Sequence, residues 1–162
     1  QGRHVYVVGG ADGAVKEALY LAKYASKVTI IHFEEKLGCI AEFQEKVSRM
    51  PNIELRLRSR LHAVYGVDQV ESLEISDEKT GAIEMIEDPG CGIFVYAGTV
   101  PNTELYQALE LQDGFIPADE HMETKIRGVY AAGDIRVKEV RQVATAVADG
   151  TIAAVHAAQQ IK

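Results

Sequence analysis

Short apolar runs separated by glycine-containing turns predict an α/β fold. Residues 5–8 and 28–33 are nearly continuous apolar runs, which is typical of strands buried on both faces of a sheet. Between them, apolar residues recur every three to four positions from 14 to 24, which predicts an amphipathic helix. Asp12 stands in the turn before this helix, where we expect its side chain to cap the free amides. Strand, turn, helix and strand have the length of a βαβ unit, so the two strands should be parallel with a right-handed crossover.

The rest of the first hundred residues contains one more helix and four more strands. They are predicted at 39–49 (helix, stopped by Met50-Pro51-Asn52), 53–58, 70–75, 82–86 and 92–96 (strands). Apolar and polar residues alternate strictly in 53–58, so this strand should expose one face to water. Residues 78–81, Glu-Lys-Thr-Gly, are typical of a hairpin turn between the strands on either side.

The pattern changes after Gly98. Val100-Pro101-Asn102 breaks it, and a mixed stretch follows to about residue 128. Residues 128–134 are predicted to form a short strand with a glycine exit, and residues 141–161 an alanine-rich helix. We therefore expect two parts, 1–97 and 98–162. The first has the pattern of a Rossmann-type parallel sheet with an added β-meander.

Composition narrows the class of protein. Of the 162 residues, 47% are hydrophobic and 25% charged, which is an ordinary globular balance. The net charge of −7 repels a phosphate backbone and argues against nucleic acid as a partner. No apolar run approaches the roughly 18 residues of a membrane span, and we expect no signal peptide at the first residues. Cys39 and Cys91 form neither a CxxC pair nor a zinc pattern, so we expect a soluble, cytoplasmic protein without a metal.

The first glycine turn is the strongest local motif. It comprises Gly9, Gly10, Ala11, Asp12, Gly13 and Ala14. In a dinucleotide-binding fold this turn lets backbone amides approach a pyrophosphate at the N-terminus of the helix. The spacing here is G-x-A-x-x-A, one residue from the usual G-x-G-x-x-A, and the methyl group of Ala11 stands where the second glycine permits close approach. A nucleotide-binding turn is favoured over a purely structural one, with weakened phosphate binding.

Three other features leave two interpretations open. Glu34, at the end of the second strand, either accepts hydrogen bonds from ribose hydroxyls or is a solvated carboxylate. Cys39 is either a reactive thiol activated at a helix start or, more in keeping with its type, a small apolar residue. Arg56, Arg58 and Arg60 are expected on one face of a strand, where they either bind an anion or, as is more common, face solvent.

Five stretches in order resemble the thioredoxin reductases among the low-molecular-weight flavoprotein disulfide reductases. They are residues 2–10, 25–32, 98–102, 128–134 and 141–146. The resemblance implies a pyridine-nucleotide domain at 1–97, inserted in a split FAD domain whose second piece is 98–162. The family's CxxC and the first FAD piece are absent from this sequence. The resemblance therefore implies that this sequence is a partial chain, which is inactive alone.

The resemblance assigns nucleotide contacts residue by residue. Residues 9–14 resemble the pyrophosphate turn, with Gly13 in place of a residue that usually carries a hydroxyl. His32 matches the histidine that opens a His-Arg-Arg segment. Phe33 and Glu34 replace both arginines, and Gly38 replaces a third. These arginines would pair with the 2′-phosphate of NADPH, so their loss argues for NADH or for a domain that no longer binds a pyridine nucleotide.

The resemblance also assigns flavin contacts in the second part. Asp134 resembles the aspartate that binds the flavin ribityl chain, and Gly133 makes room for it. Arg141, Gln142 and Val143 match the helix start beside the isoalloxazine edge, where amides suit the charge of a reduced flavin. Gly98 opens the matching stretch 98–102 and is counted with the cofactor-binding residues.

For the intact protein these matches imply an FAD-dependent reductase that passes electrons from NAD(P)H, preferably NADH, to a dithiol and then to a thioredoxin-like acceptor. A homodimer is expected. The alternatives are a ferredoxin-dependent thioredoxin reductase with a vestigial nucleotide lobe, and a non-catalytic nucleotide-binding module. The last helix is too apolar for a free tail, so we expect it to pack on the first lobe, to pair with a second copy, or to be partly disordered.

Overall fold

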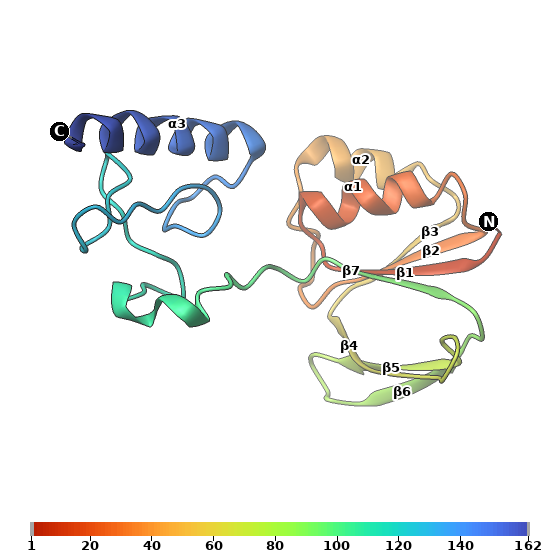
Figure 1. Cartoon of the computed structure of the whole chain (residues 1–162). Coiled ribbons are helices and arrows are strands. Elements are labelled where there is room, and N and C mark those ends of the chain that lie inside the picture. The colour runs from red at the N-terminus through yellow and green to blue at the C-terminus, as the bar shows by residue number, and fades with distance from the viewer. Residues whose placement is uncertain (1, 162) are drawn as a thin grey trace. The chain divides into compact units, whose positions relative to one another are not determined.

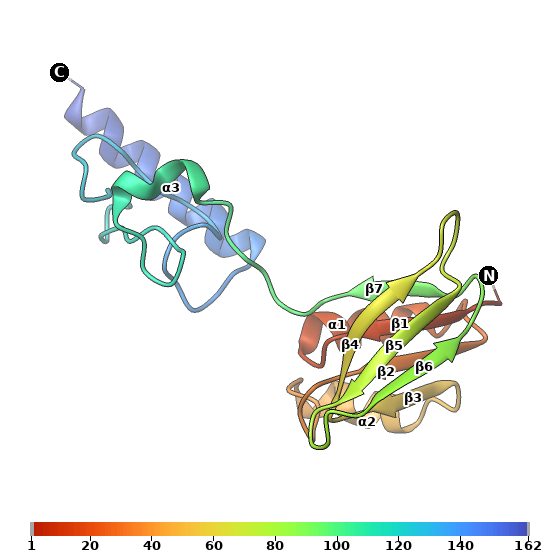
Figure 2. The ribbon, with the colours of Figure 1, turned by 90° about the horizontal axis from the view of Figure 1, so that it is seen from below.

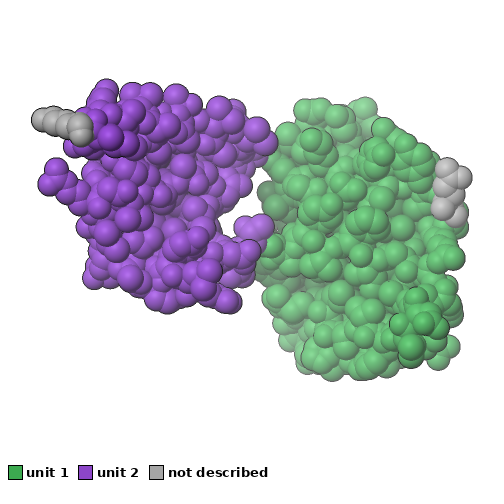
Figure 3. All heavy atoms as spheres, in the orientation of Figure 1, with its two compact units in different colours: residues 1–98 green, residues 99–162 purple. Residues whose placement is uncertain are grey.

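The computed structural model describes residues 2–161. The chain divides into two compact units, residues 1–98 and 99–162, which Figure 3 shows in different colours. Each unit is considered by itself below. Among the described residues, no helix has both the length and the apolar character that a membrane crossing requires.

The first unit is built on a four-stranded parallel sheet (Figure 1). Its strands are β1 (His4–Val8), β2 (Lys27–Ile31), β3 (Ile53–Arg56) and β7 (Gly92–Val95), in the order β3-β2-β1-β7. Helices α1 (Asp12–Leu21) and α2 (Ala41–Ser48) cover one face of the sheet. The expected βαβ unit and the parallel pairing of β1 with β2 are confirmed.

The other face of the sheet carries an antiparallel meander. It consists of β4 (Ser59–Tyr65), β5 (Ser72–Asp77) and β6 (Ile83–Glu87), which Figure 2 shows side by side across the sheet. The predicted hairpin is confirmed: β5 pairs with β6, and Asp77 Oδ1 accepts the backbone amides of Lys79 at 2.9 Å and Thr80 at 2.7 Å. An α/β fold with a parallel sheet and a three-stranded meander is therefore the observed class.

The alternation of side chains along the strands divides the core into two layers. Val7 and Ile30 face the helices and pack in one cluster with Val15 of α1. Tyr6 and Ile31 point the other way and pack against Leu73 and Ile75 of β5. Strands buried on both faces need apolar residues in succession, which is why residues 5–8 and 28–31 are nearly continuous apolar runs.

One strand was missed and one group of residues was misplaced by sequence reasoning. β4 was not predicted, because a register shift between Leu61 and Ala63 interrupts its alternation. The placement of Arg56, Arg58 and Arg60 on one face of one strand was wrong. Arg56 ends β3, Arg60 lies in β4, and Arg58 lies between them with a left-handed φ of 49°. Two strands that meet at a turn cannot present their side chains as one face.

Two local details also differ from expectation. Asp12 does not cap α1: the cap residue is Ala11, in extended conformation and without a side-chain cap bond, and Asp12 is the first helical residue. Its Oδ1 instead accepts the amide of Ile40 at 2.9 Å. Both helices are shorter than predicted, because the residues beyond Leu21 form turns and α2 starts at Ala41.

The second unit contains a short 3₁₀ helix, Glu104–Leu109, and one long helix, α3 (Val143–Gln160). Leu109, Ile116 and Ala131 form its small core. The predicted strand at 128–134 was wrong. Tyr130 pairs with Glu123 through a single antiparallel bridge, and no continuous strand lies beside this segment within residues 2–161. The predicted last helix is confirmed, and on it Val143 is 82% and Val147 64% exposed.

Candidate functional site

A pocket of about 440 Å³ opens where β1, β2 and β7 end. It is lined by the turn after β1 (residues 8–11), the segment after β2 (31–33), the start of β4 (59–61) and the segment after β7 (95–98). Parallel α/β sheets bind ligands at the carboxyl ends of their strands, where the strand order changes direction. The order β3-β2-β1-β7 places that change between β1 and β7. The pocket therefore lies where a nucleotide site is expected in this architecture.

Two glycines of the turn are required by close contacts. Gly9 has a φ of 132°, and a Cβ there would lie 2.4 Å from the carbonyl oxygen of Tyr96. A Cβ on Gly10 would lie 2.5 Å from ring atoms of His32. At Gly13, by contrast, a Cβ would meet nothing within 4 Å. The turn is thus pressed against the ends of both neighbouring strands, while position 13 is open and has room for a hydroxyl side chain.

The N-terminus of α1 faces this turn with unbonded amides. The first helical hydrogen bond runs from Val15 N to Ala11 O at 3.1 Å, so the amides of the first turn have no acceptor inside the helix. Such a helix start attracts a phosphate group. The carboxylate of Asp12 stands in the same turn and opposes an anion there, although its Oδ1 is occupied by the Ile40 amide.

His32 and Glu34 form a polar pair beside the pocket. His32 is 5% exposed, and its Nε2 lies 3.1 Å from Oε2 of Glu34. A carboxylate only accepts, so Nε2 donates to it, while Nδ1 is the one buried side-chain nitrogen or oxygen without a hydrogen-bond partner in the described part of the chain. A Cβ on Gly38 would lie 3.9 Å from Glu34 Oε2. Positions 34 and 38 are therefore neighbours, and neither carries a cation.

Arg60 and Phe33 line the pocket together, a contact that the sequence analysis did not predict. β4 brings Arg60 to the pocket, where its guanidinium carbon lies 5.0 Å from the centroid of the Phe33 ring. Arg60 donates from Nε and NH2 to the two carboxylate oxygens of Glu78, at 3.0 and 3.1 Å. This carboxylate raises the pKa of Arg60, and Arg60 in turn lowers the pKa of Glu78. A prediction of strand β4 from the sequence would have indicated this contact between Arg60 and Phe33.

Two of the expected flavin residues, Asp134 and Arg141, line a pocket of about 460 Å³ in the second unit. Gly133 is buried with a φ of 84°, and the exposed Asp134 follows it. Arg141 donates from Nε to the backbone oxygen of Asp134 at 3.2 Å and lies 4.0 Å over the ring of Phe115. The carboxylate of Asp134 forms no hydrogen bond to any of residues 2–161, so it is available to a ligand hydroxyl.

The helix start next to this pocket is well defined. Gln142 is the cap residue of α3: its backbone amide donates to Thr145 Oγ1 at 3.1 Å, and that hydroxyl donates to the backbone oxygen of Gln142 at 2.9 Å. Val143 begins the helix and is exposed. Gln142 and Val143 do not line the pocket, whereas Asp134 and Arg141 do. Gly98 lies in the first unit and lines the pocket there.

Sequence reasoning also missed Asp149, in the middle of α3. Its carboxylate is buried and accepts the Gly133 amide at 3.1 Å, Arg136 Nε at 2.7 Å and Lys138 Nζ at 2.7 Å. The hydrogen bonds from Arg136, from Lys138 and from the Gly133 amide hold the pKa of Asp149 well below its ordinary range. The carboxylate thus attaches the Gly133-Asp134 turn to α3.

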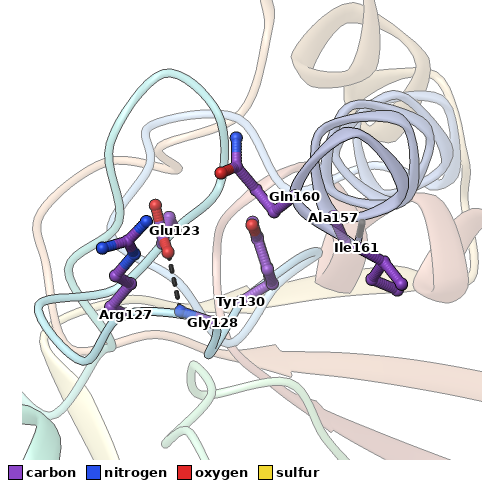
Figure 4. A pocket seen from close by; sticks show the side chains of 7 residues that line it. All are labelled: Glu123, Arg127, Gly128, Tyr130, Ala157, Gln160 and Ile161. Carbon is purple, nitrogen blue, oxygen red and sulfur yellow. Dashed lines mark hydrogen bonds between the residues drawn. The ribbon is translucent and has the colours of Figure 1, made fainter.

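A second pocket of the second unit, of about 370 Å³, lies between the loop 123–130 and the end of α3 (Figure 4). Arg127, Tyr130 and Gln160 line it, and Glu123 there accepts the amide of Gly128 at 2.7 Å. No residue that the sequence marked as functional lines this pocket.

The two cysteines do not form a redox pair. Both are free, and each is 7% exposed. Burial raises the pKa of both thiols, and Cys39 precedes α2 rather than occupying its first turn. The interpretation of Cys39 as a small apolar residue is therefore favoured over a reactive thiol.

Comparison with known proteins agrees with this geometry. The chain belongs to the pyridine nucleotide-disulphide oxidoreductase family, whose model matches residues 1–150. Within the family it is similar to thioredoxin reductases, as the sequence motifs indicated. The thioredoxin reductase of Peptoclostridium acidaminophilum is 42% identical over 98% of this chain, and that of Peptoclostridium litorale 43% identical over 98%.

Solved structures give the same result. The thioredoxin reductase of Lactococcus lactis matches with a TM-score of 0.87 and 35% identity, over 98% of this chain and 53% of that one. The chain also covers 52% of each of the two Peptoclostridium proteins. It therefore spans about half the length of the relatives that it matches.

Proposed function

We propose that residues 1–97 form a nucleotide-binding domain that prefers NADH, and that residues 98–162 supply one side of an FAD site in a thioredoxin reductase-like enzyme. The single observation that carries the preference is the His32–Glu34 pair. Glu34 places a half-exposed carboxylate beside the pocket where a 2′-phosphate would require cations. A carboxylate accepts hydrogen bonds from ribose hydroxyls and repels a phosphate.

The residues present fit a dinucleotide. Gly9 and Gly10 leave no room for side chains, because a Cβ would meet Tyr96 or His32, so the turn keeps the two glycines that begin its dinucleotide-like motif. The open amides of α1 supply donors for a pyrophosphate, and the pocket volume is within the range of cofactor sites. Bound NADH would supply a hydride to the flavin, while this chain's residues bind and orient the nucleotide.

Residues of the second unit also fit a flavin. The carboxylate of Asp134 is free to bind a ribityl hydroxyl. The preceding residue, Gly133, is buried and has a positive φ, a conformation that favours glycine. Arg141 is fixed by Phe115 and by the Asp134 backbone. In the intact protein we propose electron transfer to a thioredoxin-like disulfide and assembly as a homodimer. The 162-residue chain alone, which contains no CxxC, should show no disulfide reductase turnover.

Isothermal titration of the chain with NADH and NADPH tests the nucleotide preference. We expect NADH to bind at least tenfold more tightly than NADPH. Tighter binding of NADPH would contradict the proposal. Flavin fluorescence measures FAD binding and so tests the second unit. A disulfide reductase assay with FAD and NADH present tests the expected lack of turnover.

A second candidate function is a nucleotide lobe that has lost its ligand, in a parent reduced by ferredoxin. It is favoured by two features of the turn, the methyl group of Ala11 and the carboxylate of Asp12 in the first turn of α1. Both oppose a pyrophosphate. The absence of any heat or spectral change with millimolar NADH, in a chain that is folded, would support this candidate instead.

A further inference from the structure

We propose that Phe33 and Arg60 together form the contact surface for the adenine ring of the bound nucleotide, with Glu78 holding Arg60 in this role rather than leaving it free to bind a 2′-phosphate. The proposal rests on the proposed function of the same pocket and names the groups that recognise the base.

Phe33 is a fixed aromatic ring inside the pocket. It is 48% exposed although it lines a concave site. The buried imidazole of His32 meets it edge to face, with ring centroids 4.9 Å apart and an interplanar angle of 63°. One side of the ring is thereby supported by the protein, and the exposed part is available to a flat ligand.

Arg60 extends this surface. Its guanidinium lies 5.0 Å from the Phe33 centroid, within the distance of a cation–π contact. Purine bases stack on aromatic rings and on the planes of guanidinium groups. A neighbouring phenyl ring and guanidinium therefore offer the base two surfaces of the right kind, contributed by the end of β2 and by β4.

The ion pair between Arg60 and Glu78 favours binding of the base over binding of a 2′-phosphate. Arg60 donates two hydrogen bonds to the carboxylate of Glu78, at 3.0 and 3.1 Å, and the opposite charges of the pair cancel. The other charged groups nearby are also balanced or acidic: Arg58 lies 4.0 Å from Glu35, and Glu34 adds a negative charge. The pocket therefore has no uncompensated cation for a phosphate dianion, whereas stacking needs only the plane of the guanidinium.

The experiment separates the two halves of the nucleotide. The folded chain is titrated with NADH, with ADP-ribose, which carries the adenosine half, and with nicotinamide mononucleotide, which does not. We expect Phe33→Leu, which keeps an apolar side chain but removes the ring, to weaken NADH and ADP-ribose binding about tenfold. Binding of nicotinamide mononucleotide should not change. Tyr65→Leu is the matched control, because Tyr65 is an exposed aromatic residue of β4 outside the pocket.

Two further variants test the role of Arg60. Arg60→Lys keeps the charge and an ion pair with Glu78 but loses the planar group, and it should weaken ADP-ribose binding several-fold as Phe33→Leu does. Glu78→Gln frees the charge of Arg60 and should tighten NADPH binding about fivefold while NADH changes little. Circular dichroism establishes that each variant folds.

The outcomes distinguish the inference from the proposed function. If the chain binds NADH but Phe33→Leu and Arg60→Lys bind ADP-ribose as tightly as the parent chain, the adenine assignment is overturned and the nucleotide function stands. If ADP-ribose binds and depends on Phe33 while NADH does not bind, the assignment is supported and the proposed function fails. If neither ligand binds the folded chain, both are overturned.

Discussion

Arg136 and Asp149 form a two-pronged ion pair in the interior of the second unit. Arg136 donates from Nε to Oδ2 at 2.7 Å and from NH2 to Oδ1 at 3.1 Å. Lys138 donates to the same carboxylate, so two cations share one anion, and all three side chains are largely buried, at 17%, 9% and 7% exposure for Arg136, Lys138 and Asp149. Within residues 2–161, Asp149 is the only carboxylate that forms an ion pair with either cation.

Removing this charge should destabilise the second unit strongly. In Asp149→Asn the two cations lose their counter-charge while the side-chain volume is kept, so we expect a loss of about 3 kcal/mol in the free energy of unfolding. Urea unfolding followed by the NMR signals of α3 measures it. Glu139→Gln, an exposed residue nearby, is the control and should cost little. A loss below about 1 kcal/mol in Asp149→Asn would show that the ion pair is not a stabilising contact.

The same carboxylate predicts how the second unit responds to acid. Its pKa is lowered in the folded chain, chiefly by Arg136, so its stabilising contribution is present above the ordinary carboxyl pKa of about 4 and is lost as the pH falls further. Helical circular dichroism between pH 7 and pH 2 should show loss of structure beginning below about pH 4. In Asp149→Asn this part of the pH dependence should disappear, and an unchanged profile would argue against the assignment.

The glycine turn allows a matched pair of substitutions. Gly10→Ala places a methyl group against the His32 ring, so we expect a loss of about 1–3 kcal/mol in stability and at least tenfold weaker NADH binding. Gly13→Ala enters open space within α1 and should raise stability by up to about 1 kcal/mol, with a smaller loss of NADH affinity than Gly10→Ala. Thermal unfolding and titration of both variants check this, and equal effects would contradict the proposed close contact.

Glu34 should determine the choice between nucleotides. Glu34→Gln keeps a hydrogen-bonding side chain but removes the charge that repels a phosphate, so NADPH affinity should rise at least fivefold relative to NADH. Glu35→Gln removes a charge from the adjacent exposed residue and should leave this ratio within about twofold. The two ratios are obtained from the same titrations, and identical changes in both variants would mean that only the overall charge matters.

The cysteines should be inert in the folded chain. Burial raises the pKa of both thiols, so little thiolate forms at neutral pH. We expect a chromogenic disulfide reagent to react with Cys39 and Cys91 far more slowly than with free cysteine, and with both immediately in denaturant. Rapid reaction of Cys39 at neutral pH would revive its interpretation as an activated thiol.

The two central strands of the parallel sheet, β1 and β2, could be predicted because they are largely buried and are therefore nearly continuous apolar runs. The strand at 128–134 was predicted from the same kind of run, yet strand structure also needs a neighbouring backbone, and Tyr130 finds one only in the single bridge to Glu123. Strand β4 was not predicted, for the opposite reason. It has its partner in β5, but the irregular register at Leu61 and Ala63 hides the alternation.

The site shows a similar division. Gly9 and Gly10 were predicted from a local motif, whereas His32 was predicted only from the resemblance to thioredoxin reductases. Asp149 was missed because an acidic residue within a helix usually faces solvent, and its partners lie 11 to 16 residues earlier. Arg60 was considered only as an anion-binding or solvated residue, because its contact with Phe33 depends on the position of β4.

The contact between Gly10 and the His32 ring has a mechanical consequence. The imidazole is held by Glu34 on one side and rests on the turn after β1 on the other. A ligand that displaces the imidazole must therefore also displace the turn. We expect the chain to respond to a dinucleotide as a single body, with occupancy at the sugar end felt at the phosphate end.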